Sequence, residues 1–116
     1  MPHVLVLSGP ALPLLDMANQ MKPDGWDLHV CTSDSTEAEV KEAAEIADFI
    51  LVFGHGVSDT VLRVAKKTKL VQLCSAGFDG INLRLAGELG IPVANNGGAN
   101  AISVAEFAIT LTLCTI

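Results

Sequence analysis

Apolar residues are concentrated in five short runs along the chain. The runs are rich in Val, Ile and Leu and occupy residues 3–7, 26–31, 48–53, 70–74 and 91–94. Short, nearly continuous apolar runs are typical of strands that are covered on both faces of a sheet. The pattern therefore predicts five buried strands, and the more polar segments between them are long enough to hold a helix each.

Residues that commonly start a helix precede these intervening segments. They predict helices over 12–21, from 37 to about 46, from 59 to 67, and from 83 until Gly90, which would end that helix. The starting residues are Pro10 and Pro13 for the first helix, the capping box Thr36 and Glu39 for the second, Ser58 for the third and Asn82 for the fourth.

The alternation of buried strands with helices indicates an α/β fold with a parallel sheet, because parallel strands are joined by helical crossovers. We expect a flavodoxin-like, doubly wound sheet of five strands in the order 2-1-3-4-5, with helices on both faces. The order 3-2-1-4-5 of a half Rossmann domain is the alternative. No repeat or linker interrupts the pattern, and the length of 116 residues suits one domain.

Composition narrows the class of protein further. The chain carries a net charge of −6, and an acidic chain repels the phosphate backbone, so nucleic-acid binding is not expected. The apolar run 101–116 is shorter than the roughly 20 residues that cross a bilayer, so no membrane anchor is expected. Three widely spaced cysteines indicate neither a disulfide framework nor a metal site, which favours a cytoplasmic setting.

Function is expected at the carboxyl edge of the sheet, where the loops after parallel strands meet and bind ligands. Residues 75–80, here called the glycine turn, follow the fourth strand and contain Gly77 and Gly80. Because glycine permits positive φ and a close approach to a ligand, the N–H groups of this turn could form a nest for a carboxylate or phosphate. An ordinary strand-to-helix turn is the alternative interpretation.

The loop over 95–100 is rich in Asn and Gly and precedes the apolar run. Asn100 lies three residues before Ser103, and Ser103 with Glu106 forms a further capping-box pattern. If Ser103 begins the last helix, the Asn100 amide is free to bind a ligand. If Asn100 begins it, Asn100 is a structural cap, which spacing alone slightly favours.

Three sequence motifs occur in the second half of the chain: LVQLCSAGFDGINL at 70–83, LGIPVAN at 89–95 and NAISVAEF at 100–107. In their order and spacing they resemble the N-terminal, substrate-binding domain of the D-isomer-specific 2-hydroxyacid dehydrogenases. The resemblance implies an enzyme in which a hydride passes between NAD or NADP and C2 of a small 2-hydroxy or 2-keto acid. It also implies that residues 1–100 are the substrate-binding domain and that 101–116 begin an interdomain helix leading to an NAD-binding domain.

The resemblance further assigns roles to individual residues. Backbone N–H groups of the glycine turn would hold the substrate carboxylate, an amide side chain would bind substrate, and the loop after the third strand would border the cleft. The implied substrate-binding residues are Ala76, Gly77, Phe78, Asn100, His55 and Gly54, and those near the cofactor are Ala101, Val104 and Ala76.

The resemblance places the catalytic residues outside this chain. The family's G-x-G-x-x-G fingerprint and its catalytic arginine, acidic residue and histidine match no position here, so we expect these 116 residues alone to be inactive and the full-length enzyme to be a homodimer. The last helix is apolar nearly all round and lacks a stop signal. We therefore expect it to be covered by parts of the enzyme beyond residue 116.

A stand-alone flavodoxin-like module, such as a phosphorelay receiver or a corepressor-like regulator, is the alternative function. A receiver needs an acidic cluster after the first strand and an aspartate after the third. Ser8, Gly9, Gly54 and His55 occupy those places, so the receiver interpretation is disfavoured.

Overall fold

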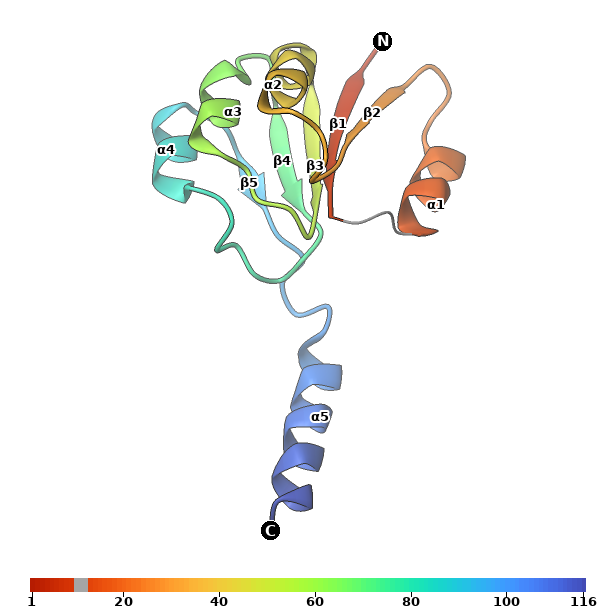
Figure 1. The fold of residues 1–116 in the computed structure, drawn as a ribbon, viewed down its shortest axis with the longest axis vertical. Helices are drawn as coiled ribbons and strands as arrows, with labels where there is room; N and C mark the ends of the chain where they lie inside the picture. The colour runs from red at the N-terminus through yellow and green to blue at the C-terminus, as the bar shows by residue number, and fades with distance from the viewer. Residues whose placement is uncertain (10–12) are drawn as a thin grey trace.

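Five parallel strands form one sheet in the computed structural model, which describes residues 1–9 and 13–116 (Figure 1). The strand order is β2-β1-β3-β4-β5, which confirms the flavodoxin-like order over its alternative. The predicted roles of Pro10 and residue 12 lie outside the described residues. The strands are β1 (His3–Ser8), β2 (Asp27–Cys31), β3 (Phe49–Phe53), β4 (Leu70–Leu73) and β5 (Val93–Ala94).

The predicted helix starts are largely confirmed by their hydrogen bonds. Thr36 Oγ1 accepts the N–H of Glu39 at 3.2 Å, and the Glu39 carboxylate accepts the N–H of Thr36 at 2.9 Å. Ser58 and Asn82 cap their helices in the same local manner, and Gly90 ends the fourth helix with a φ of 72°. The helices are α1 (Pro13–Met21), α2 (Glu37–Ile46), α3 (Asp59–Val64), α4 (Leu83–Glu88) and α5 (Ala101–Cys114).

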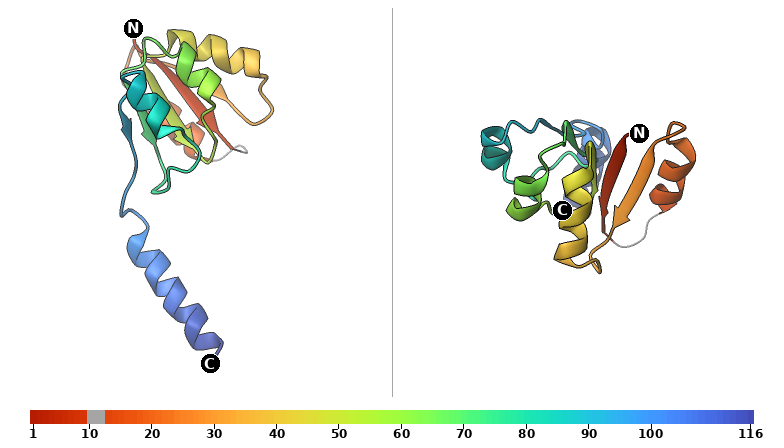
Figure 2. Two further views of the ribbon diagram at one scale, coloured as in Figure 1. Left: turned by 90° about the vertical axis from the view of Figure 1, so that its left-hand side faces the viewer. Right: turned by 90° about the horizontal axis from the view of Figure 1, so that it is seen from above.

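Helices lie on both faces of the sheet, as predicted, but they cover the faces unequally (Figure 2). Apolar residues of α2, α3 and α4 join alternate residues of β1, β3 and β4, including Leu5 and Leu7, in the main core. Because neighbouring strand residues point to opposite faces, Val4 belongs to the other side. There α1 borders an apolar groove of about 410 Å³, in which Trp26 stacks on Phe49 with ring centroids 5.5 Å apart.

Two elements are at least two residues shorter than the sequence predicts. β5 holds two residues rather than 91–94, and Pro92 lacks the N–H that a longer strand would donate to the sheet. α3 ends at Val64 rather than at 67, because the Lys69 N–H donates to the Asp48 carbonyl at 2.8 Å and draws the chain toward β4. The Thr68 hydroxyl supports this turn by donating to the carbonyl that follows α2, at 3.0 Å.

The last helix, α5, extends away from the sheet (Figures 1 and 2). It is apolar, yet none of its residues is buried, and Phe107 is 64% exposed. The residues that the structure describes therefore supply no cover for this helix. In the part of the chain that the structure describes, no helix combines the length and the apolarity needed to cross a membrane.

Candidate functional site

The loops after β3, β4 and β5 meet at the carboxyl edge of the sheet, as the parallel topology requires. The N–H of Val57 donates to the carbonyl of Gly80 at 2.8 Å, which joins the loop after β3 to the glycine turn. The amide of Asn95 donates to the carbonyl of Ala76 at 2.8 Å, which joins the loop after β5 to the same turn. The glycine turn is thus held between its two neighbours in the sheet.

In its hydrogen bonds with the rest of the chain, the backbone of the glycine turn accepts rather than donates. Four of its six carbonyl oxygens accept hydrogen bonds: Ser75 accepts the N–H of Asn96 at 2.9 Å, Ala76 the amide of Asn95, Gly77 the hydroxyl of Ser75 at 2.9 Å, and Gly80 the N–H of Val57. Among the described residues, none accepts a hydrogen bond from the N–H groups at positions 76, 77 and 78. The turn therefore presents three consecutive donors, which suit an anion.

The sequence offered two reasons for glycine at position 77: a positive φ and a close approach to a ligand. The sequence suggested positive φ in this turn, but neither Gly77 nor Gly80 has a positive φ, so that expectation is wrong. A Cβ built at Gly77 would meet no described atom within 4 Å. Nothing in the described chain requires glycine there, whereas a bound group that approaches the backbone would.

A hollow of about 130 Å³ opens beside these donors, and we call it the turn hollow. Gly54, His55, Gly77 and Phe78 all line it, so the structure brings together four of the six predicted substrate-binding residues. Ala76 lies in the same turn and is half-buried, but it is not among the residues that line the hollow. Phe78 is 51% exposed and presents an apolar ring at the mouth.

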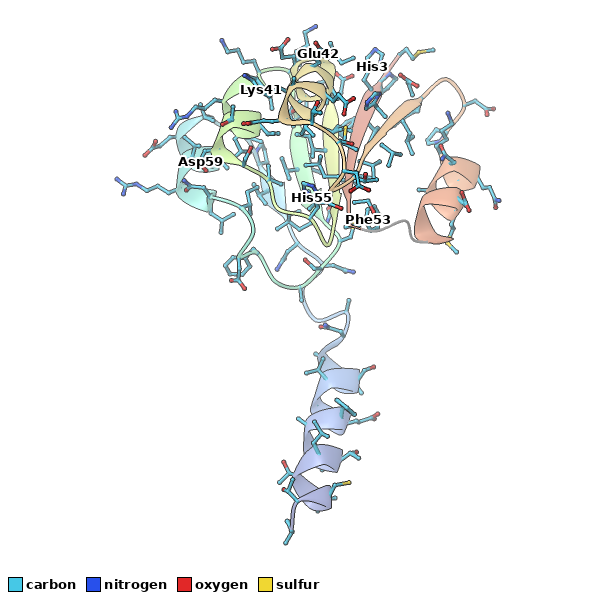
Figure 3. All side chains as sticks on the ribbon, viewed as in Figure 1. His3, Lys41, Glu42, Phe53, His55 and Asp59 are labelled. Atoms are coloured by element: carbon cyan, nitrogen blue, oxygen red, sulfur yellow. The ribbon has the colours of Figure 1, made fainter. Side chains whose placement is uncertain are left out.

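His55 lies at the carboxyl edge of the sheet, at the opposite end from His3 (Figure 3). Its ring nitrogen Nδ1 is hydrogen-bonded to the carbonyl oxygen of Gly56. Because a carbonyl oxygen can only accept, Nδ1 carries a hydrogen, and Nε2 is the nitrogen left to contact a ligand. In the neutral ring, Nε2 accepts a hydrogen bond from a hydroxyl group.

Asn100 occupies the N-cap position of α5, but its side chain makes no capping hydrogen bond. Asn100 therefore has the backbone position of the structural alternative without acting as a side-chain cap. Substrate binding by its amide stays a prediction. Ser103 lies inside α5, and its predicted capping box is therefore wrong. Ala101 and Val104, in the first turn of α5, are exposed. Asn100 lies outside the lining of the turn hollow.

Sequence reasoning missed the residues that hold the glycine turn in place. Asn95 and Ser75 were recognisable only as polar turn residues, although their side chains bind the turn's carbonyls. Cys74 comes directly before the turn, and burial raises the pKa of its thiol. A thiol kept protonated is a poor nucleophile, which supports a structural role for Cys74.

Comparison with known proteins identifies the family of this chain. The family model described as D-isomer specific 2-hydroxyacid dehydrogenase, catalytic domain, matches residues 4–113. A D-3-phosphoglycerate dehydrogenase of Archaeoglobus fulgidus is 32% identical over 93 residues, which are 80% of this chain and 18% of that protein. A hydroxypyruvate reductase of Thermotoga maritima is 30% identical over 102 residues, which are 87% of this chain and 33% of that protein.

Solved structures show the same fold. An NAD-dependent formate dehydrogenase of Staphylococcus aureus in complex with NAD matches 96% of this chain with a TM-score of 0.78 at 20% identity, over 37% of its own length. An NAD-bound 3-phosphoglycerate dehydrogenase of Entamoeba histolytica matches 96% with a TM-score of 0.77 at 20% identity, over 38% of its length. The chain thus spans less than two fifths of these proteins. Since the family model covers nearly all of the sequence, the chain belongs to the D-isomer specific 2-hydroxyacid dehydrogenases, as part of their catalytic domain.

Proposed function

We propose that this chain is the substrate-binding part of an oxidoreductase that transfers a hydride between NAD(P) and C2 of a small 2-hydroxy or 2-keto acid. The observation that carries the proposal is the row of three N–H donors at Ala76, Gly77 and Phe78 that have no acceptor among the described residues and lie beside a hollow. Every 2-hydroxy or 2-keto acid has a carboxylate next to the reacting carbon, and this turn suits that group.

Backbone donors explain how an acidic chain binds an acid. The chain has a net charge of −6, so its overall field repels a carboxylate. Aligned N–H groups act at short range and strengthen their bonds to an ionised acceptor. The carboxylate held there would orient C2, while Gly54 and His55 border the acid in the turn hollow. The exposed amide of Asn100 is a second anchor from the side of α5.

The cofactor would be held mainly by parts of the enzyme outside these residues. Ala101 and Val104 are exposed at the start of α5, and Ala76 lies in the turn; small apolar side chains there fit the apolar face of a nicotinamide ring without blocking it. NAD(P), when bound, supplies or accepts the hydride. The residues described here bind and orient the acid, and the proton transfer belongs to catalytic residues outside this chain.

The same proposal includes the organisation of the whole enzyme. Residues 1–100 form the substrate-binding domain, and 101–116 begin the interdomain helix, which is consistent with α5 standing clear of the sheet (Figure 2). An NAD(P)-binding domain follows, the full-length protein is a cytoplasmic homodimer, and its specificity for NAD or NADP is set in that domain. A stand-alone binding or regulatory module would share the anion site without needing the second domain.

A titration with a minimal acid tests the proposal. Amide resonances of the ¹⁵N-labelled chain are followed while pyruvate is added, and neutral pyruvamide, in which an amide replaces the carboxylate, is the matched control. We expect pyruvate to shift the amides of Ala76, Gly77 and Phe78 and pyruvamide to leave them in place. Equal shifts with both compounds, or none with pyruvate, would overturn the assignment. Turnover of NADH and pyruvate by the 116-residue chain alone would show that its catalytic residues are present after all.

A further inference from the structure

A second hollow adjoins the turn hollow and shares His55 with it. It measures about 400 Å³ and lies between the loop after β2 and the starts of α2 and α3. Core residues of β1, α2 and α3 form its floor, and its polar wall includes Thr32, Ser33, Glu37 and Ser58. We call it the hydroxyl hollow.

The turn hollow by itself is small for a substrate. Its volume of about 130 Å³ is about a third of the 400 Å³ of the hydroxyl hollow. That space suits a carboxylate and the carbon beside it. Any longer arm attached to C2 must leave the turn hollow, and the hydroxyl hollow is the adjoining space on the far side of His55.

The wall of the hydroxyl hollow offers hydrogen bonds without positive charge. The hydroxyl oxygens of Thr32 and Ser58 already accept backbone N–H groups, both at 3.3 Å, so their hydrogens remain available to donate. Glu37 can accept a hydrogen bond, and its carboxylate is free of the capping box, which uses Glu39. Among the described residues that line the two hollows, Glu37 is the one with full charge at neutral pH, and it is negative.

We propose that the hydroxyl hollow receives the arm of the substrate beyond C2 and selects acids with a neutral, hydroxyl-bearing arm over phosphorylated ones. The inference rests on the proposed function. A substrate hydroxyl would donate to Glu37 or to Nε2 of His55 and accept from Thr32 or Ser58. A phosphate in the same place would face the Glu37 carboxylate, and at the start of α2 the N–H of Glu39 is already used by the Thr36 hydroxyl.

Two acids that differ only in the phosphate test the inference. The ¹⁵N-labelled chain is titrated with D-glycerate and with 3-phospho-D-glycerate, and the amides of the glycine turn and of residues 32–37 are followed. We expect D-glycerate to shift both sets and to bind about fivefold more tightly than the phosphorylated acid, from one charge repelling a dianion across solvent. Glu37→Gln should bring the two affinities within about twofold, mainly by improving the phosphorylated acid.

Glu45→Gln is the matched control, since it removes the same charge from an exposed position of α2 outside both hollows. It should leave the affinity ratio unchanged. Equal or tighter binding of 3-phospho-D-glycerate, or a D-glycerate titration that leaves residues 32–37 unmoved, would overturn the inference. If pyruvate still shifts the glycine turn in that case, the proposed function stands; if no acid shifts it, both fail.

Discussion

Replacing Gly77 with alanine separates a structural glycine from a functional one. Gly77 has an ordinary φ, and an added Cβ would have no described neighbour within 4 Å. The change therefore removes conformational freedom from the unfolded chain without straining the fold. We expect Gly77→Ala to raise the free energy of unfolding by about 0.4–1 kcal/mol. For a domain of this size, that corresponds to a rise in Tm of roughly 2–8 °C.

Substrate binding should change in the opposite direction. Gly77 lines the turn hollow, and a methyl group there would hold a carboxylate away from the neighbouring N–H donors. Loss of one hydrogen bond to a charged group costs about 1.5–3 kcal/mol, which is roughly a 10- to 100-fold weaker Kd. Thermal unfolding gives the stability, and the pyruvate titration gives the affinity of the same sample.

Gly87→Ala is the matched control for this experiment. Gly87 lies in α4, also has an ordinary φ and also has open space around its Cβ position. Its replacement should stabilise the chain by up to about 1 kcal/mol through helix propensity and leave pyruvate affinity unchanged. The reasoning is refuted if Gly77→Ala destabilises the chain, because the glycine would then be structural, or if the variant binds pyruvate as well as the parent chain.

Three further predictions address the residues around the site and the amino edge of the sheet. Asn95→Ala removes the side-chain hydrogen bond that joins the loop after β5 to the glycine turn. It should lower the free energy of unfolding in urea by about 1 kcal/mol and weaken pyruvate binding severalfold. Unchanged binding would argue against preorganisation of the turn. The N–H of His3 donates to the Asp48 carboxylate at 2.9 Å and lowers the pKa of that carboxyl. Asp48 therefore contributes stability above its unfolded pKa of about 3.9, and this stability is lost as pH falls through the lower folded pKa. Asp48→Asn should flatten the acid limb of a plot of unfolding free energy against pH, and a curve parallel to that of the parent chain would contradict this. Burial raises the pKa of Cys74, so a disulfide reagent at neutral pH should modify exposed Cys114 roughly tenfold faster or more, whereas equal rates would show that Cys74 is accessible.

Much of the local structure could be predicted because its causes lie close together in the sequence. The capping box of Thr36, the caps Ser58 and Asn82 and the terminating Gly90 all act within a few residues. Strand burial likewise follows from apolar runs that are visible in the sequence. The strand order was predictable as well, because right-handed crossovers between buried parallel strands leave few topologies.

The candidate site was only partly predictable. The order of strands placed the glycine turn and His55 at one edge, and the structure confirms that they share a hollow. The direction of the turn's hydrogen bonds depends on Asn95, which lies 19 residues from its partner Ala76. No spacing rule connects such a pair, because their contact is set by how β4 and β5 align in the sheet.

The sequence by itself determined the elements and their caps, because these depend on propensities and hydrogen bonds between near neighbours. Tertiary structure decided where elements stop and which groups remain free. α3 ends early because the N–H of Lys69 donates to the Asp48 carbonyl of another segment. The open space beside Gly77 can be recognised only once the surrounding residues are placed. These features result from contacts between distant segments, whose geometry is fixed by the packing of the whole sheet rather than by any local pattern.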